Sequence, residues 1–66
     1  MRLHVDEKAD ALYIRFDDSA VVESEEVRPG VVLDFDAQGR VIGLEMLRVN
    51  ERLPEADLWK VQFEVA

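Results

Sequence analysis

The sequence predicts a mainly β or small α+β fold: an antiparallel β-meander of about five strands, followed by a C-terminal segment with a short helix or an extra strand. Apolar and polar residues alternate with a period of two in several short runs, the pattern of strands that bury one face. Clusters of Gly, Pro, Asp and Ser separate the runs and are typical of turns. The 66 residues are enough for one small domain.

The clearest run covers residues 31–46 and predicts a β-hairpin. Large apolar residues occupy alternate positions on both sides of a short turn that contains Gly39. Residues 36–39 suit a type I turn with Gly39 in the left-handed region, where a Cβ atom would be penalised. Two registers compete for this hairpin, and they differ by one residue.

A three-residue loop would pair Asp36 with Arg40 and divide the large apolar side chains between the two faces. A four-residue loop would pair Phe35 with Arg40 and Leu33 with Ile42, so that the large apolar side chains share one face. Since a one-residue slip moves a whole set of side chains to the other face, burial should decide the register. We therefore predict the four-residue loop. The opposite face would then carry Val32, Asp34, Val41, Gly43 and Glu45.

Three further strands are expected before the hairpin. Leu3–Val5 alternates, and residues 11–16 form a stronger alternating run. Residues 21–27 alternate less cleanly and are rich in Glu, which predicts an edge strand with a bulge. Arg28-Pro29-Gly30 is expected to form a turn. The sheet would bury these side chains on one face: Leu12, Ile14, Phe16, Leu33, Phe35, Ile42 and Leu44.

The pattern changes after residue 47. Residues 48–53 are polar and fit a loop or one helical turn. Pro54–Trp59 has the features of a short helix start, because Pro is favoured at the first helical position and acidic residues suit the first turn. Residues 61–65 alternate again and predict a final strand as the alternative.

The charge is strongly acidic: fifteen Asp and Glu against eight Lys and Arg, a net charge of −7. This balance disfavours direct binding to nucleic acid, which needs clustered cations, and is compatible with a basic protein partner. No apolar run reaches membrane-spanning length and no signal-peptide core is present, so we expect a cytoplasmic protein without membrane contact. Because a chain this short without Cys has a small core and no disulfide, we expect a homodimer or a partner complex.

The segment from Asp34 to Glu45 is a near match to a calcium-binding loop. Asp34, Asp36 and Gln38 stand at its first, third and fifth positions, Gly39 at the sixth and Glu45 at the twelfth. Gln replaces the usual Asp or Asn at the fifth position, and the flanks alternate as strands instead of helices. We therefore predict no metal site, with Asp34, Asp36 and Glu45 as the weak candidates.

No set of residues predicts catalysis. Arg15, Asp34 and Glu45 are expected on one outer face, where cross-strand pairing is the expected role of an Arg beside carboxylates. His4 is the only His, and it is expected on a different strand from Ser24, so the chain lacks the pattern of a catalytic triad. We expect a non-enzymatic protein with no catalytic residues and no cofactor.

Two groups of residues are candidates for binding a partner. Glu23, Glu25 and Glu26 form the densest acidic patch, either a solvated edge strand or a docking edge for a basic protein. Trp59 and Phe63 are the large aromatic residues outside the meander. They are expected either to pack on their own sheet or to anchor an interface, where Trp is enriched.

Three stretches together resemble the family catalogued as domain of unknown function 2283, DUF2283. They are the run ADALYIR at residues 9–15 with Asp6 before it, the run GVVLDFD at residues 30–36 with Glu26 before it, and the run GRVIGLE at residues 39–45. The resemblance covers about residues 1–50. It departs at Lys8, where the family often has Pro-Glu, and the tail from Leu53 lies outside the pattern.

The resemblance implies a small prokaryotic or phage-type protein with no established activity. Some members are similar to antitoxins encoded beside small basic proteins. The family supplies no catalytic residues, and its characteristic Asp34, Gly39, Gly43 and Glu45 are expected to serve the turn, the bend and cross-strand pairing. We expect residues 1–66 to form one domain, in which residues 1–50 are the family-like sheet and residues 51–66 are a C-terminal extension.

Three functions stay open at this point. The first is a non-enzymatic protein–protein interaction module, antitoxin-like toward a basic partner. The second is a self-associating structural domain without a ligand. The third is a weak calcium-binding hairpin at Asp34–Glu45.

Overall fold

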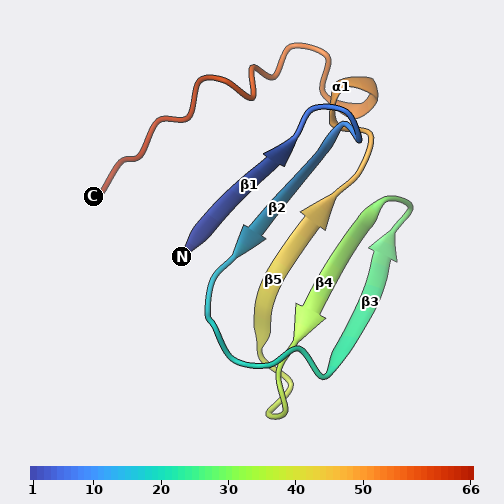
Figure 1. Cartoon of the computed structure of the whole chain (residues 1–66), viewed down its shortest axis with the longest axis vertical. Helices are drawn as coiled ribbons and strands as arrows, with labels where there is room; N and C mark the ends of the chain where they lie inside the picture. The colour runs from blue at the N-terminus through green and yellow to red at the C-terminus, as the bar shows by residue number, and fades with distance from the viewer.

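The structure is a computed structural model that describes all residues from Met1 to Ala66. Five strands form one antiparallel sheet, and one helical turn follows them. In Figure 1 the strands lie in a single layer, with the helical turn at one end and the remaining chain outside the first strand. The predicted class, mainly β with a short C-terminal helix, is confirmed. The elements are β1 (Arg2–Asp6), β2 (Ala11–Arg15), β3 (Glu23–Arg28), β4 (Val31–Phe35), β5 (Val41–Met46) and α1 (Val49–Arg52).

The strands are arranged in the order β1-β2-β5-β4-β3, which differs from the consecutive order of a simple meander. The segment between β2 and β3 passes along the end of β5 and β4 (Figure 1), so that β2 to β5 form a Greek key. This order puts β5 in the centre and the Glu-rich β3 at an edge. The strand that holds the buried Ile42 is therefore flanked on both sides. The most charged strand, β3, has only one neighbour, as predicted for it.

The β4–β5 loop corrects the predicted register. The amide of Asp36 donates to the carbonyl oxygen of Arg40 at 3.0 Å, and the amide of Gly39 donates to the carbonyl oxygen of Asp36 at 3.0 Å. The loop therefore has three residues, and the predicted four-residue loop is wrong. Gly39 has a φ of 76°, which confirms the left-handed position expected for it.

A bulge at Ile42 explains why the three-residue loop does not divide the apolar side chains. Phe35 lies opposite Val41, but the next residue of β4, Asp34, lies opposite Gly43. β5 therefore holds one extra residue at this point, which shifts the pairing by one. The sequence analysis treated the favourable turn and the favourable burial as alternatives, whereas the bulge satisfies both.

The register assigns the side chains to two faces, because directly opposite residues of neighbouring strands share a face. Because of the bulge, Val41 lies on the apolar face and not on the opposite face predicted for it. Phe16, which was predicted on the apolar face, lies beyond the end of β2. The apolar face carries Leu3, Val5, Leu12, Ile14, Val31, Leu33, Phe35, Val41, Leu44 and Met46. The polar face carries Arg2, His4, Tyr13, Arg15, Ser24, Glu26, Val32, Asp34, Gly43 and Glu45.

The helical turn α1 is fastened to the turn between β1 and β2. The carbonyl oxygen of Asp10 accepts the amide of Val49 at 2.9 Å, and the Asp10 carboxylate accepts the amide and the side-chain Nδ2 of Asn50. Val49 is buried there, with 1% of its surface exposed. The helical turn left open for residues 48–53 is confirmed, and the helix predicted at Pro54–Trp59 is wrong. The strand predicted for residues 61–65 is absent, and no helix or strand follows Arg52.

Candidate interaction surfaces

The apolar face of the sheet is incompletely covered. Leu3 and Val41 leave 44% and 45% of their surface exposed, and Leu33 and Leu44 at the centre of the face are half-buried. Only Ile42 and Val49 are fully buried apolar residues in the whole chain. A sheet normally packs its apolar face on another layer, and here α1 stands at one end of the sheet (Figure 1).

The total accessible surface gives the same result. The chain exposes 5262 Å². A compact globular protein of 7.6 kDa exposes about 4,300 Å² by the usual scaling of area with mass. The excess of roughly 1,000 Å² fits a single-layer sheet followed by an extended C-terminal segment.

The acidic edge, defined as Glu23, Glu25 and Glu26, lies on β3, which pairs only with β4. All three side chains are exposed, and none of them forms an ion pair. Glu23 and Glu25 lie opposite Phe35 and Leu33, so they border the apolar face, whereas Glu26 belongs to the polar face. The predicted bulge in this strand is confirmed between Glu26 and Arg28.

The C-terminal segment carries the largest exposed apolar side chains. Trp59 and Phe63 leave 79% and 85% of their surface exposed, and Val61 and Val65 leave 64% and 81% exposed. The expectation that Trp59 packs on its own sheet is therefore wrong. In Figure 1 the segment runs outside β1 and leaves the apolar face uncovered.

The polar face is organised around Asp34. Its carboxylate accepts a hydrogen bond of 2.8 Å from the Tyr13 hydroxyl and one of 2.6 Å from the Ser24 hydroxyl. Gly43 lies opposite Asp34 on the neighbouring strand and leaves the space for this contact. A Cβ atom at Gly43 would be 2.8 Å from the Tyr13 oxygen. Three strands are thus linked by one carboxylate, so Asp34 has the cross-strand role expected for it, with two hydroxyl groups as its partners.

The cross-strand pairing expected between Arg15 and a carboxylate is not formed. Arg15 donates through Nε to the carbonyl oxygen of Asp17 at 2.6 Å and through Nη2 to the carbonyl oxygen of Ser19. The Tyr13 hydroxyl, and not Arg15, donates to the Asp34 carboxylate. Sequence reasoning missed Tyr13 because the contact depends on β5 lying between β2 and β4, which alternation within one strand does not reveal.

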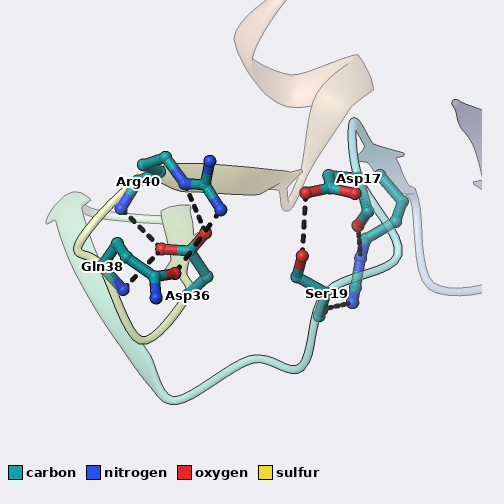
Figure 2. A network of polar contacts seen from close by, with 6 residues as sticks. Asp17, Ser19, Asp36, Gln38 and Arg40 are labelled. Atoms are coloured by element: carbon teal, nitrogen blue, oxygen red, sulfur yellow. Dashed lines mark hydrogen bonds and ion pairs between the residues drawn. The ribbon is translucent and has the colours of Figure 1, made fainter.

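Two aspartates at the same end of the sheet are held by local donors (Figure 2). The amides of Gln38 and Arg40 each donate to the Asp36 carboxylate at 2.9 Å, and Arg40 Nε donates at 2.7 Å. The backbone donation from Arg40 is the main reason why the pKa of Asp36 is lowered. The Ser19 hydroxyl donates to Asp17 at 2.9 Å and lowers the pKa of that carboxyl. These groups stabilise turns.

The weak metal candidates are not brought together. Asp36 is buried and bound to Arg40, Asp34 is engaged on the polar face, and Glu45 lies opposite Tyr13 and Val32. No group of three or more His, Cys, Asp or Glu side chains is placed to hold a metal ion. The geometry gives no support to the calcium alternative.

The polar residues considered for a triad are also separate. His4 lies on β1 and Ser24 on β3, which are the two opposite edges of the sheet, and Ser19 lies in the connection between β2 and β3. The helical turn α1, with four residues, is far too short to span a bilayer.

Comparison with known proteins gives one match. The family model described as "Protein of unknown function (DUF2283)" matches residues 2–50, most of the chain and all five strands. No curated protein and no solved structure matches the chain. The match ends inside α1, so the exposed C-terminal segment lies beyond it. The chain belongs to the DUF2283 family.

Proposed function

We propose that the protein is a non-enzymatic protein–protein interaction module whose apolar face binds a second copy of the chain. The observation that carries this proposal is the single-layer sheet with an uncovered apolar face. Half-buried Leu33, Leu44 and Ile14 lie side by side across three neighbouring strands at its centre. Exposed contiguous apolar surface of this kind marks interaction sites.

The charge distribution favours a second copy as the occupant. The four strands that make up most of the apolar face contribute only uncharged side chains to it, and the charged residues Glu23, Glu25 and Arg28 stand at one margin on β3. An apolar centre with a charged rim is the usual anatomy of an interface. Such a face is complementary to itself, and two sheets packed face to face form a sandwich about 10 Å thick.

The polar face supports a non-enzymatic role. Tyr13, Ser24 and Asp34 are engaged with one another, and Arg15 is held by backbone carbonyl oxygens. These groups stabilise the sheet. The apolar face is the surface whose side chains no other layer of the chain covers.

Sedimentation of two double variants tests the proposal. Leu3→Glu with Val41→Glu places two charges on exposed positions of the apolar face, so the fold should tolerate them. We expect the natural protein to sediment as a dimer at micromolar concentration. This variant should dissociate with a Kd raised by on the order of 100-fold, because two buried apolar side chains are lost and charges are desolvated.

The matched control is His4→Glu with Gln38→Glu, which adds the same two charges outside the apolar face. His4 is adjacent to Leu3 but lies on the polar face, and Gln38 is exposed in the β4–β5 loop. This control should remain a dimer. A natural protein that is monomeric at micromolar concentration, or a control that dissociates as fully as the first variant, would contradict self-association through this face.

A basic partner at the acidic edge is the second candidate, and it corresponds to the antitoxin-like role that the family resemblance implies. It is favoured by three exposed carboxylates without ion-pair partners on an open edge strand. Replacing Glu23, Glu25 and Glu26 with Gln should weaken such a partner strongly and leave self-association nearly unchanged. Co-purification from the native host, with the natural and the triple-Gln chain compared, separates the two candidates. A stoichiometric basic protein lost in the triple variant would support the second.

A further inference from the structure

We propose that residues 58–63 form a sixth strand along the open edge of β1 in the same chain, antiparallel to it, and that this strand completes the apolar face. The inference rests on the proposed function, because the new strand gains most of its burial when a second copy covers that face. It names the C-terminal segment as a part of the interaction surface.

The edge of β1 is available for pairing. β1 pairs only with β2, and no backbone hydrogen bond joins β1 to residues 53–66. An edge strand presents a row of free N–H and C=O groups, and adding an extended segment is a common way to satisfy them. The segment has a strand pattern, with apolar residues at every second position from Trp59 to Val65 and no Gly or Pro.

The structure already places the start of the segment beside the end of β1. Leu58 and Trp59 line one small cavity together with Val5 and Glu7. From this point the chain runs outside β1 in the direction of the N-terminal end of that strand (Figure 1). The direction of the segment is therefore opposite to that of β1, as antiparallel pairing requires.

We take the register from Trp59 and Val5, which line the same small cavity. With Trp59 opposite Val5, antiparallel pairing places Val61 opposite Leu3, and Phe63 follows opposite Met1. Leu3 and Val5 belong to the apolar face, so Trp59, Val61 and Phe63 would extend that face by one strand. The polar residues Lys60 and Gln62 would then share the polar face with His4 and Arg2.

The exposures agree with this register. Met1 and Leu3 leave 86% and 44% of their surface exposed, and their proposed partners Phe63 and Val61 leave 85% and 64% exposed. Pairing would bring together the exposed apolar side chains at this edge of the sheet. A single added strand whose apolar side stays exposed to water is marginal, because ordering its backbone costs conformational entropy that little burial offsets. A second copy on the apolar face supplies the missing burial, so strand addition and association should be coupled.

Engineered cysteine pairs test the register, and the natural chain contains no Cys that would interfere. The face-matched pairs are Leu3→Cys with Val61→Cys, and His4→Cys with Lys60→Cys. One of these is a non-hydrogen-bonded pair, whose Cβ atoms are the closer ones. The controls recombine the same four substitutions across the faces: Leu3→Cys with Lys60→Cys, and His4→Cys with Val61→Cys.

We expect mild oxidation to give an intrachain disulfide in at least one face-matched pair at a rate about tenfold above either control. The products are read by mass spectrometry and non-reducing electrophoresis. Equal rates in matched and control pairs would overturn the proposal. Disulfides between two chains in place of intrachain ones would overturn the pairing within one chain. Sedimentation of the reduced proteins reports self-association independently, so failure of the sixth strand and failure of the proposed function are distinguished.

Discussion

The two faces of this sheet differ in where their side chains find partners. On the polar face, Asp34 accepts hydrogen bonds from Tyr13 and Ser24, so side chains of β2, β3 and β4 satisfy one another. On the apolar face, the side chains of four strands are left half-buried or exposed. The Asp34 contacts of the polar face are therefore made within one chain, whereas the apolar face is left without a second layer. Under the proposed self-association, the difference teaches that the fold and the interface are encoded on opposite sides of the same five strands.

The largest effect is expected at Ile42, the bulge residue on which the arrangement of both faces depends. Ile42→Ala removes one of the two fully buried apolar side chains, which leave only 2% and 1% of their surface exposed. We expect a loss of about 2–5 kcal/mol in the free energy of unfolding, measured by urea denaturation at fixed protein concentration. A loss below about 1 kcal/mol would mean that the bulge can repack without this side chain.

The next effect concerns the polar face. Gly43→Ala places a Cβ atom 2.8 Å from the Tyr13 oxygen and 3.1 Å from Asp34 Oδ2. We expect a loss of about 1–3 kcal/mol on denaturation, as for other overpacked sites. In a Tyr13→Phe background the same substitution should cost less, because the crowded oxygen is gone. Equal losses in the two backgrounds would contradict a direct contact between this position and Tyr13.

Tyr13→Phe alone should have a smaller effect, about 1 kcal/mol, because it removes one hydrogen bond to Asp34 and retains the ring. Its effect on self-association sharpens the comparison of the faces. The dimer dissociation constant, measured by sedimentation, should be unchanged, since Tyr13 lies on the polar face. A dissociation constant that changes as much as in Leu3→Glu with Val41→Glu would show that the polar face takes part in the interface.

The smallest effect is one of pH. The pKa of Asp36 is lowered in the folded protein, mainly by the backbone N–H of Arg40. A lowered folded pKa adds stability above the ordinary value of 3.8, and this stability is lost as the pH falls through the folded pKa. Asp36→Asn should therefore flatten the acid limb of the stability curve below about pH 4, followed by thermal denaturation. Gln38→Ala retains the backbone donor and should leave that limb unchanged.

Much of the sheet was predictable because its signals are local. Alternation within each run placed the five strands, and the Glu-rich run from Glu23 predicted an edge with a bulge. The hairpin register was wrong because the sequence offers a favourable turn at Gly39 and a favourable burial pattern that disagree by one residue. The bulge at Ile42 makes the two compatible, and no residue at that position is typical of a bulge.

The long-range features were not predictable from one chain. Residues 48–53 left a loop and one helical turn open, and the turn forms at Val49, where Asp10, forty residues earlier, binds its N-terminal amides. Pro54, which signals a helix start, begins no helix. The strand order that brings Tyr13 to Asp34 depends on β5 entering between β2 and β4. For the candidate site, alternation identified most of the apolar face and the acidic edge. The exposure of Trp59 depends on packing that local patterns do not report.

Peroxide oxidation of Met46, which lies half-buried on the apolar face, tests the central claim most directly. Met1, which is 86% exposed, serves as the internal reference, since these are the only two methionines. The account predicts that, at micromolar concentration, Met46 of the natural protein oxidises more slowly relative to Met1 than it does in the Leu3→Glu with Val41→Glu variant. Equal relative rates in the two proteins would mean that nothing covers the apolar face and would contradict the account.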